Sequence, residues 1–204
     1  MITLPRLYAI LDSSLFPGTE ALCLFAEELA SAGVTLLQYR NKSGNARQML
    51  DQARELKSRM GASVKLIMND RADLCLAAGF DGVHVGQDDL SPAGARPVIG
   101  PSLTLGVSTH NPGQIAAADQ TSADYIAVGP VFATLSKKNP DPTIGIEGVR
   151  AARKATVKPL VAIGGLTRAN CQSVMEAGAD SVAVISDLLR EPRKSVEEFL
   201  RILG

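Results

Sequence analysis

The sequence has no tryptophan and few other aromatic residues, with three tyrosines and five phenylalanines among 204 residues. Yet 46% of the residues are apolar, so a hydrophobic core must be built mainly from alanine, valine, leucine and isoleucine. Small and branched side chains of this kind suit the layered interior of an α/β barrel and the buried faces of its helices.

An excess of either charge is also absent, because 21 Lys and Arg balance 21 Asp and Glu. No overall field draws the protein to nucleic acid or to an anionic membrane, although a local phosphate site is still allowed. We therefore expect small-molecule partners, no nucleic acid and no membrane.

Cysteines are few, and Cys23, Cys75 and Cys171 are odd in number, far apart and free of C-x-x-C spacing. This argues against a disulfide framework and a zinc site. Each lies among apolar residues of a predicted helix, which favours a buried packing role. No apolar run approaches the roughly 20 residues of a membrane span, and the N-terminus does not resemble a secretion signal. We expect a cytoplasmic protein.

Short β-branched apolar runs alternate with longer amphipathic segments along the chain. Residues 20–33 and 46–60 repeat apolar positions every three or four residues, as a helix with one buried face requires. Glycines 33, 61, 79 and 178 are placed to end helices in a left-handed conformation. The predicted strands are residues 7–11, 36–40, 65–69, 82–85, 103–108, 125–129, 159–164 and 181–186.

This alternation implies parallel pairing, because a crossover helix returns the chain to start the next strand in the same direction. Eight units of about 25 residues predict a single-domain (β/α)8 TIM barrel over residues 1–204. An open doubly wound sheet is the competing topology. It usually has fewer strands and a glycine-rich turn after its first strand, where this chain has LDSSLFPG.

Polar residues follow the predicted strands, at the end of the barrel where active sites are built. Asp70 and Asp89 are hard oxygen ligands, suited to a Mg²⁺ ion that bridges to phosphate oxygens. The alternative for any one of these residues is a solvated charge at the rim. The cations that could neutralise the remaining phosphate charge are Arg40, Lys42, Arg71 and Lys137.

A second cluster of small residues follows the seventh and eighth predicted strands, in AIGGLT (162–167) and VIS (184–186). Loops at these two positions of a barrel commonly bind a phosphate monoester through backbone amides. On sequence alone, a tight turn between strand and helix explains the Gly-Gly pair equally well.

Six motifs lie at the predicted strands and the loops after them, namely QYRNK (38–42), NDRAD (69–73), GVHVGQDD (82–89), GVSTH (106–110), GPVFATLSK (129–137) and VAIGG (161–165). Together they resemble the thiamine phosphate synthase family, in the same order and with similar spacing from Leu7 to about Leu189. The resemblance implies a transferase that joins an aminopyrimidine diphosphate to a thiazole phosphate, giving thiamine phosphate and pyrophosphate.

The resemblance also implies roles for individual residues. It places Mg²⁺ on Asp70 and Asp89. The residues implied in catalysis are Arg40, Lys42, Ser108 and Lys137. Those implied for the pyrimidine diphosphate are Gln38, Tyr39, Arg40, Asn41, Lys42, Asn69, Ser108 and Lys137. Those implied for the thiazole phosphate are Thr134, Leu135, Ser136, Gly165, Ile185 and Ser186.

The implied chemistry is dissociative, because an aminopyrimidine can spread the positive charge left on its methylene carbon when pyrophosphate departs. Preorganised positive charges would stabilise the leaving anion. No protein nucleophile is required, in keeping with the lack of a Cys or Ser activated by a neighbouring base.

Two departures from the family pattern stand close together. Ser136 replaces a second threonine, which keeps the hydroxyl group. Residues 139–145, NPDPTIG, carry two prolines that would stiffen a loop covering the site and affect turnover.

Rival functions remain open at this level. A thiazole tautomerase of the same superfamily would bind one monophosphate and shift a proton with a histidine such as His110, but it needs neither paired metal carboxylates nor Lys42 and Lys137. A non-catalytic barrel that senses thiamine phosphates is the other rival. His84 lies within a buried strand and is expected to be a hydrogen-bonded structural residue. A homodimer is the working hypothesis for oligomeric state.

Overall fold

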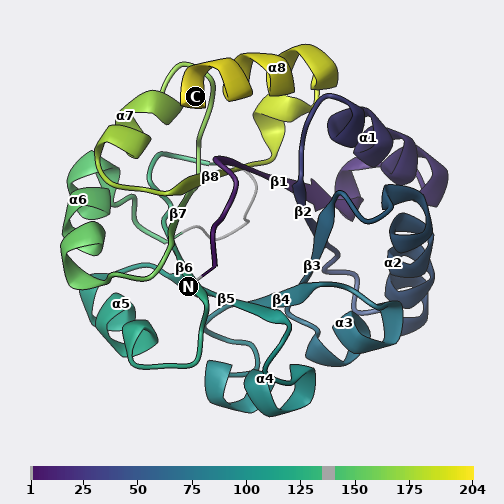
Figure 1. The fold of residues 1–204 in the computed structure, drawn as a ribbon, viewed down its shortest axis with the longest axis horizontal. Helices are drawn as coiled ribbons and strands as arrows, with labels where there is room; N and C mark the ends of the chain where they lie inside the picture. The colour runs from purple at the N-terminus through teal and green to yellow at the C-terminus, as the bar shows by residue number, and fades with distance from the viewer. Residues whose placement is uncertain (1, 135–140) are drawn as a thin grey trace.

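The computed structural model describes residues 2–134 and 141–204, which form a closed barrel of eight parallel strands ringed by helices (Figure 1). The strands are β1 (Leu7–Asp12), β2 (Leu36–Arg40), β3 (Lys65–Asn69), β4 (Gly82–Val85), β5 (Thr104–Thr109), β6 (Tyr125–Val128), β7 (Leu160–Ile163) and β8 (Ser181–Val184). The helices are α1 (Thr19–Ser31), α2 (Ala46–Met60), α3 (Ala72–Ala78), α4 (Pro92–Ile99), α5 (Pro112–Asp119), α6 (Gly145–Ala155), α7 (Cys171–Glu176) and α8 (Pro192–Leu203). Two short 3-10 helices, η1 (Ser13–Leu15) and η2 (Ser186–Leu188), follow β1 and β8. The predicted TIM barrel is confirmed.

Strand order follows chain order, and β8 closes the barrel by pairing Leu7 of β1 with Val182. The predicted strands agree closely with those observed, and the largest difference at a single boundary is at the end of β8. This strand ends at Val184 instead of residue 186, because the backbone turns at Ile185 into η2. The four glycines predicted to end helices all have positive φ angles. Gly79, for example, caps α3 at φ 68° and donates its N–H to the Cys75 and Leu76 carbonyls.

Side chains alternate between the inside of the barrel and the helical layer, because a strand has a period of two. Inside, Tyr8 and Ile10 of β1 meet residues of the other strands, and Ile2 and Leu4 pack beneath them. In Figure 1 the N-terminal segment crosses the end of the barrel at which the strands begin. The inner cluster consists of Tyr8, Ile10, Leu36, Ile67, Tyr125, Ala127, Val161 and Ala183.

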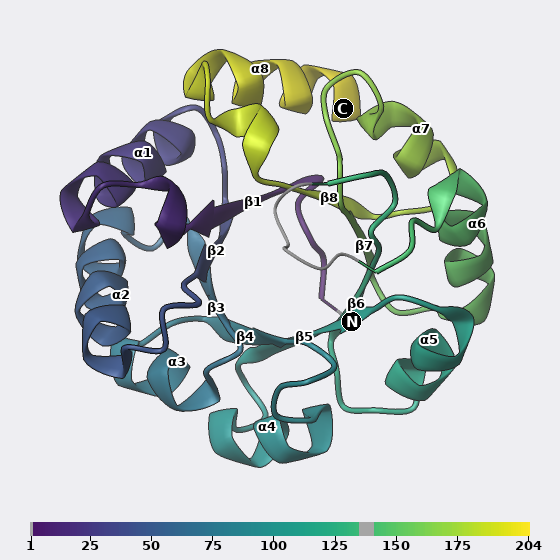
Figure 2. The same cartoon turned by 180° about the vertical axis from the view of Figure 1, so that it is seen from behind.

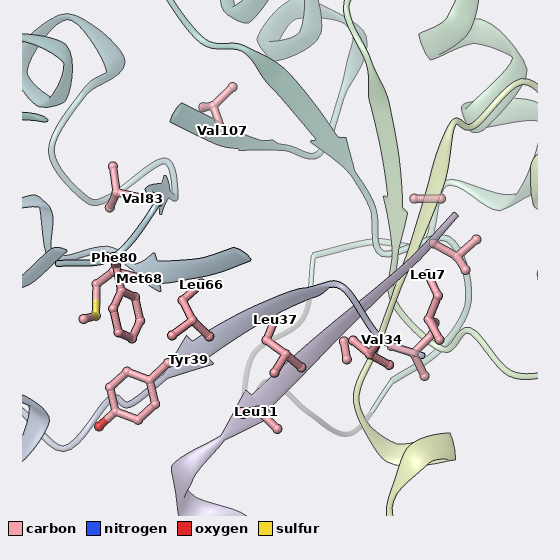
Figure 3. Close-up of a cluster of buried hydrophobic side chains, with 14 of the residues drawn as sticks. Leu7, Leu11, Val34, Leu37, Tyr39, Leu66, Met68, Phe80, Val83 and Val107 are labelled. Carbon is pink, nitrogen blue, oxygen red and sulfur yellow. The ribbon is translucent and has the colours of Figure 1, made fainter. Parts of the chain in front are cut away.

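The larger core lies between the strands and the helices. Figure 3 shows Leu7 and Leu11 of β1 near Leu37 of β2, with Leu66 and Met68 of β3 beyond them. Each fully buried leucine of this kind contributes roughly 1.5–3 kcal/mol to folding. Cys23, Cys75 and Cys171 are free and buried, as expected for packing residues.

Three aspartates hold the end of the barrel where the strands begin. Asp81, Asp124 and Asp180 directly precede β4, β6 and β8. Each accepts a backbone N–H from the first or second residue of the neighbouring strand, β3, β5 or β7, at 2.7–2.9 Å. Each also forms an ion pair with the helix before that neighbouring strand, through Lys57 of α2, Arg96 of α4 or Arg153 of α6. Hydrogen bonds to a charged group contribute about 1.5–3 kcal/mol each, so this end stabilises the fold.

Within the described ranges, no helix is both long and apolar enough to cross a membrane.

Candidate active site

A cavity of about 460 Å³ opens at the carboxyl ends of the strands. This is the end of the barrel that lies behind the N-terminal segment in Figure 1 and is seen from the other side in Figure 2. The short strands deliver one or two residues each to it, because the residue that ends a strand and the loop after it meet there. Among the residues to which the resemblance gives a substrate or metal role, those lining it are Gln38, Arg40, Lys42, Asn69, Asp70, Asp89, Ser108, Thr134, Gly165, Ile185 and Ser186.

Three of the sequence-derived candidates do not bring their side chains to this cavity. The Tyr39 hydroxyl donates to Gln52 Oε1 of α2 at 2.6 Å, and Asn41 Nδ2 donates to the Tyr39 hydroxyl at 3.0 Å. Both side chains are buried outside the barrel, because Tyr39 follows the inward-facing Gln38 and the pleat turns it the other way. Arg71 likewise turns away and pairs with Asp73. Leu135, Ser136 and Lys137 lie outside the described residues.

Asp70 and Asp89 form the acidic part of the site. Burial, and then the Asp89 carboxyl beside it, raise the pKa of Asp70 to about 6, although Lys42 opposes the shift. Asp89 accepts the Gly86 N–H at 2.9 Å, and a Cβ on Gly86 would lie only 2.8 Å from Asp89 Oδ2. Asp70 itself has a φ of 65°, a left-handed conformation that costs a non-glycine residue free energy and is typical of functional sites.

The carboxylate pair fits a divalent cation. Two carboxylates held together in a partly buried site repel each other when both are ionised, and a bound Mg²⁺ relieves that repulsion while taking its other ligands from water and phosphate. Among residues 2–134 and 141–204, no group of three His, Cys, Asp or Glu side chains could hold a metal.

The two described cations of the site are already paired with carboxylates. Lys42 Nζ lies 2.5 Å from Asp70 Oδ2, and its side chain is half exposed. Arg40 pairs with Asp12 at the end of β1, which also accepts the Ser14 N–H at the start of η1. Asp12 thus fixes the position of the Arg40 guanidinium group at the mouth of the barrel.

Polar side chains continue from the cavity into the barrel. Ser108 Oγ lies 2.8 Å from His84 Nε2, and His84 Nδ1 lies 2.9 Å from the Tyr125 hydroxyl. Burial lowers the pKa of His84 to about 4, so its ring is neutral near pH 7. The expectation of a hydrogen-bonded buried histidine is confirmed, and His84 also lines the cavity.

The loops after β6 and β7 are joined through their backbones. Val131 N donates to Ile163 O at 2.9 Å, and Phe132 N donates to Gly164 O at 3.0 Å. A Cβ on Gly165 would overlap the Ala133 carbonyl oxygen, and its φ is 62°. The close approach of the loop after β6 therefore explains why glycine is needed at these two positions. As a result, small residues line this wall of the cavity.

Arg168 connects this wall to the loop after β8. Its backbone N–H donates to Asp187 Oδ2 at 2.9 Å, and its guanidinium group pairs with Asp187 and with Glu198 of α8. Gly165 and Ser186, which flank these residues, are thereby held on the same side of the cavity.

His110 follows β5 and lines the cavity. Its Nδ1 donates to the Gly129 carbonyl at 2.6 Å, and its Nε2 lies 3.6 Å from Asp141 Oδ2. Helix α5 begins two residues later, with Asn111 as its cap. Of the segment expected to cover the site, residues 139 and 140 lie outside the described residues, and Ile144 N donates to Pro130 O at 2.9 Å.

Sequence reasoning missed Asp12, Tyr8 and Gln87. Asp12 ends the first strand, so the rule applied to the other strand ends would have found it. Gln87 donates to the Ser108 carbonyl at 2.6 Å and lies in a motif already singled out. Tyr8 lies inside the first strand, where an aromatic residue is indistinguishable from core.

Comparisons with known proteins agree on one family. The family model for thiamine monophosphate synthase matches residues 7–188. A thiamine-phosphate synthase from Koribacter versatilis is 61% identical, covering 99% of this chain and 97% of that protein. One from Chloroflexus aurantiacus is 46% identical, covering 89% and 83%. A solved structure of thiamine phosphate pyrophosphorylase from Pyrococcus furiosus has a TM-score of 0.85 at 32% identity, covering 97% of this chain and 95% of that one. The chain belongs to the thiamine monophosphate synthase family.

Proposed function

We propose that this protein is a thiamine-phosphate synthase, an alkyl-transferring enzyme of thiamine biosynthesis. It joins an aminopyrimidine diphosphate to a thiazole phosphate and releases pyrophosphate. The observation that carries the proposal is the composition of this cavity, in which Asp70, Asp89 and Lys42 line one wall while Gly165 and Ser186 line another. The charged wall suits a diphosphate with its metal ion, and the wall of small residues suits a phosphate monoester bound through backbone amides.

The pyrimidine diphosphate binds over β2 to β5. Gln38, Asn69 and Ser108 line the cavity there and offer amide and hydroxyl groups to the pyrimidine ring. Asn69 Nδ2 is buried without a hydrogen-bond partner among the described residues. An unpaired buried donor costs about 1–3 kcal/mol, so a substrate acceptor at this point would recover that free energy.

Arg40, Lys42 and Lys137 hold the diphosphate, and Asp70 and Asp89 would hold Mg²⁺. When bound, the ion would supply positive charge to neutralise the diphosphate as it becomes a leaving group. Lys42 is half exposed at the end of a flexible side chain, so it exchanges its contact with Asp70 for one with a phosphate oxygen. Arg40 is oriented by Asp12 and supplies a fixed positive charge.

The thiazole phosphate binds across the cavity, against Thr134, Gly165, Ile185 and Ser186. Leu135 and Ser136 extend this site in the family pattern. Small side chains allow backbone amides to approach the phosphate, and the Arg168 contacts with Asp187 hold the two loops in register.

The reaction then follows a dissociative course. The bond between the methylene carbon and the diphosphate oxygen breaks, the electron pair leaves with pyrophosphate, and the aminopyrimidine spreads the positive charge. The thiazole nitrogen attacks the methylene carbon and forms the new C–N bond. No protein nucleophile takes part. Burial raises the pKa of Cys23 to about 11 and that of Cys75 to about 12, so neither is a thiolate near neutral pH.

The test is pyrophosphate release from purified protein given both substrates and Mg²⁺. We expect release that needs both substrates and the metal, and that falls at least a hundredfold in Asp70→Ala, as for loss of a strong transition-state contact. Asp73→Ala is the matched control, since Asp73 is exposed, lies three residues away and pairs with Arg71 outside the cavity.

The rival functions give different results. A tautomerase using His110 would convert a thiazole phosphate isomer without pyrimidine diphosphate or metal, and a sensor would bind thiamine phosphate without releasing pyrophosphate. Either result contradicts the proposal. We further propose a homodimer that works in the cytoplasm, where free cysteines such as the three here stay reduced.

A further inference from the structure

Five side chains from five strands, four of them buried and the fifth, Ser108, partly buried, form one continuous chain of hydrogen bonds across the barrel. Gln38 Nε2 donates to the Tyr8 hydroxyl at 2.9 Å, and the Tyr8 and Tyr125 hydroxyls are 3.0 Å apart. The Tyr125 hydroxyl meets His84 Nδ1, and His84 Nε2 meets Ser108 Oγ. Both ends of this chain line the cavity, while Tyr125 is wholly buried.

The donors and acceptors along this chain are fixed by counting protons. The Tyr8 hydroxyl accepts from Gln38, and among the described residues the Tyr125 hydroxyl is the one acceptor within reach of the Tyr8 proton, so that proton goes to Tyr125. Tyr125 then gives its proton to His84 Nδ1. The neutral imidazole therefore carries its proton on Nε2 and donates it to Ser108 Oγ.

The consequence lies at the two ends, in the cavity. Ser108 Oγ already accepts from His84, so the Ser108 hydroxyl proton is available as a donor to a bound molecule. The Gln38 amide group donates to Tyr8, which fixes its orientation and leaves its oxygen as an acceptor.

The surrounding residues are shaped for this chain. A Cβ on Gly106 of β5 would overlap the Tyr125 hydroxyl and lie 2.5 Å from His84 Nδ1, so only glycine leaves room for this hydrogen bond. The His84 and Tyr125 rings stack with centroids 5.5 Å apart, and Tyr8 meets Tyr125 edge to face at 6.1 Å. Burial raises the pKa of both tyrosines, so their hydroxyls stay protonated.

We propose that Tyr8, Tyr125 and His84 are positioning residues. They make Ser108 a hydrogen-bond donor and Gln38 an acceptor toward the bound substrate, and so select an aminopyrimidine. This role rests on the transferase activity proposed above. An aminopyrimidine has an amino donor and ring-nitrogen acceptors. The corresponding oxo-pyrimidine reverses the pattern at the exchanged group, and a site built to hydrogen-bond one group rejects its reversed analogue.

The first test is the tautomer of His84 and does not depend on turnover. The sequence has two histidines, so nitrogen-15 NMR of histidine-labelled protein shows two imidazoles, and a His110→Gln variant assigns them. We expect a neutral His84 with its proton on Nε2, and a gain of the Nδ1 tautomer in Tyr125→Phe. A proton on Nδ1, or a charged ring, in the unaltered protein at pH 7.5 would overturn the proposal.

The second test is kinetic, in Tyr8→Phe and Tyr125→Phe, which each remove one hydroxyl and keep the ring. We expect a three- to tenfold rise in KM for the pyrimidine diphosphate, an unchanged KM for the thiazole phosphate, and a reduced preference for the amino over the oxo substrate. The control is Thr109→Val, on the same strand as Ser108. It removes a buried hydroxyl that, among the described residues, donates to the Ala127 carbonyl of β6. It should leave all three quantities unchanged.

The outcomes separate the two proposals. If the unaltered protein releases pyrophosphate and the tyrosine variants match it in KM and selectivity, the positioning role is wrong and the transferase stands. If the unaltered protein releases none, the proposed function is wrong and with it the selection of substrate.

Discussion

Replacing Asp70 by asparagine should stabilise the protein while removing metal-dependent activity. Asparagine has nearly the same shape and tolerates the left-handed φ of 65° as aspartate does, so the backbone cost is unchanged. What changes is the charge: the Asp70 carboxyl is partly buried beside Asp89, and its pKa is raised to about 6.

The size and sign of the effect follow from that pKa. A carboxyl whose pKa is higher in the folded than in the unfolded protein destabilises the fold when it is ionised. This destabilisation is complete above about pH 6 and vanishes below the unfolded pKa near 4. A pKa raised by about two corresponds to about 3 kcal/mol in the free energy of unfolding. Because solvent reaches part of the group, we expect about 1–2 kcal/mol. The lost contact with the half-exposed Lys42 subtracts little.

The assay is thermal and urea unfolding of both proteins with EDTA at pH 8, 6 and 4.5. Asp70→Asn should be the more stable at pH 8, with a melting temperature roughly 2–4 °C higher per kcal/mol, and the difference should shrink as pH falls below 6. Adding Mg²⁺ should stabilise the unaltered protein more than the variant, since a ligand stabilises only the state that binds it. A variant of equal or lower stability, with no dependence on pH, would refute this account of the acidic pair.

Three further substitutions test other parts of the site and fold. Gly86→Ala should push the Asp89 carboxylate aside and raise the Mg²⁺ concentration for half-maximal activity about tenfold; an unchanged metal titration contradicts this. Gly165→Ala, which overlaps the Ala133 carbonyl at φ 62°, should raise KM for the thiazole phosphate more than KM for the pyrimidine diphosphate, and equal effects in steady-state kinetics argue against separate subsites. Asp180→Ala should lower the free energy of unfolding by about 2–3 kcal/mol in urea titrations while leaving kcat unchanged, because Asp180 lies at the other end of the barrel; a loss of kcat in folded protein would count against that division.

The fold was predictable because its signal repeats. Eight apolar runs, each followed by a helical segment, leave few topologies, and one misplaced boundary such as the end of β8 does not alter the count. Asp70, Asp89 and Ser108 were found for a related reason: in parallel strands, the last residues of every strand meet at one end.

Side-chain direction was harder to predict than position. Tyr39 and Asn41 lie in the same motif as Gln38, yet their side chains face the helices, because neighbours along a strand point to opposite sides. Applying that alternation to residues 38–42 would have separated the inward-facing set from the outward-facing one.

Partners distant in sequence could not be predicted at all. Nothing near Tyr8 indicates that it meets Tyr125, which is 117 residues away, and Gly106 shows its purpose only once both neighbours are in place. Such contacts depend on how the barrel closes, which one sequence does not specify at atomic detail.

The aspartates at the start of β4, β6 and β8 have a consequence for how this barrel can change. Each serves two adjacent strands and the helix that precedes the first of the two. The framework is therefore assembled from similar strand pairs whose attachments lie at the end of the barrel opposite the cavity. Loops at the carboxyl ends of the strands, around the cavity, can therefore be lengthened, shortened or exchanged without loosening those attachments. A designer who wished to give this chain a new substrate could treat one face as replaceable and leave the other untouched.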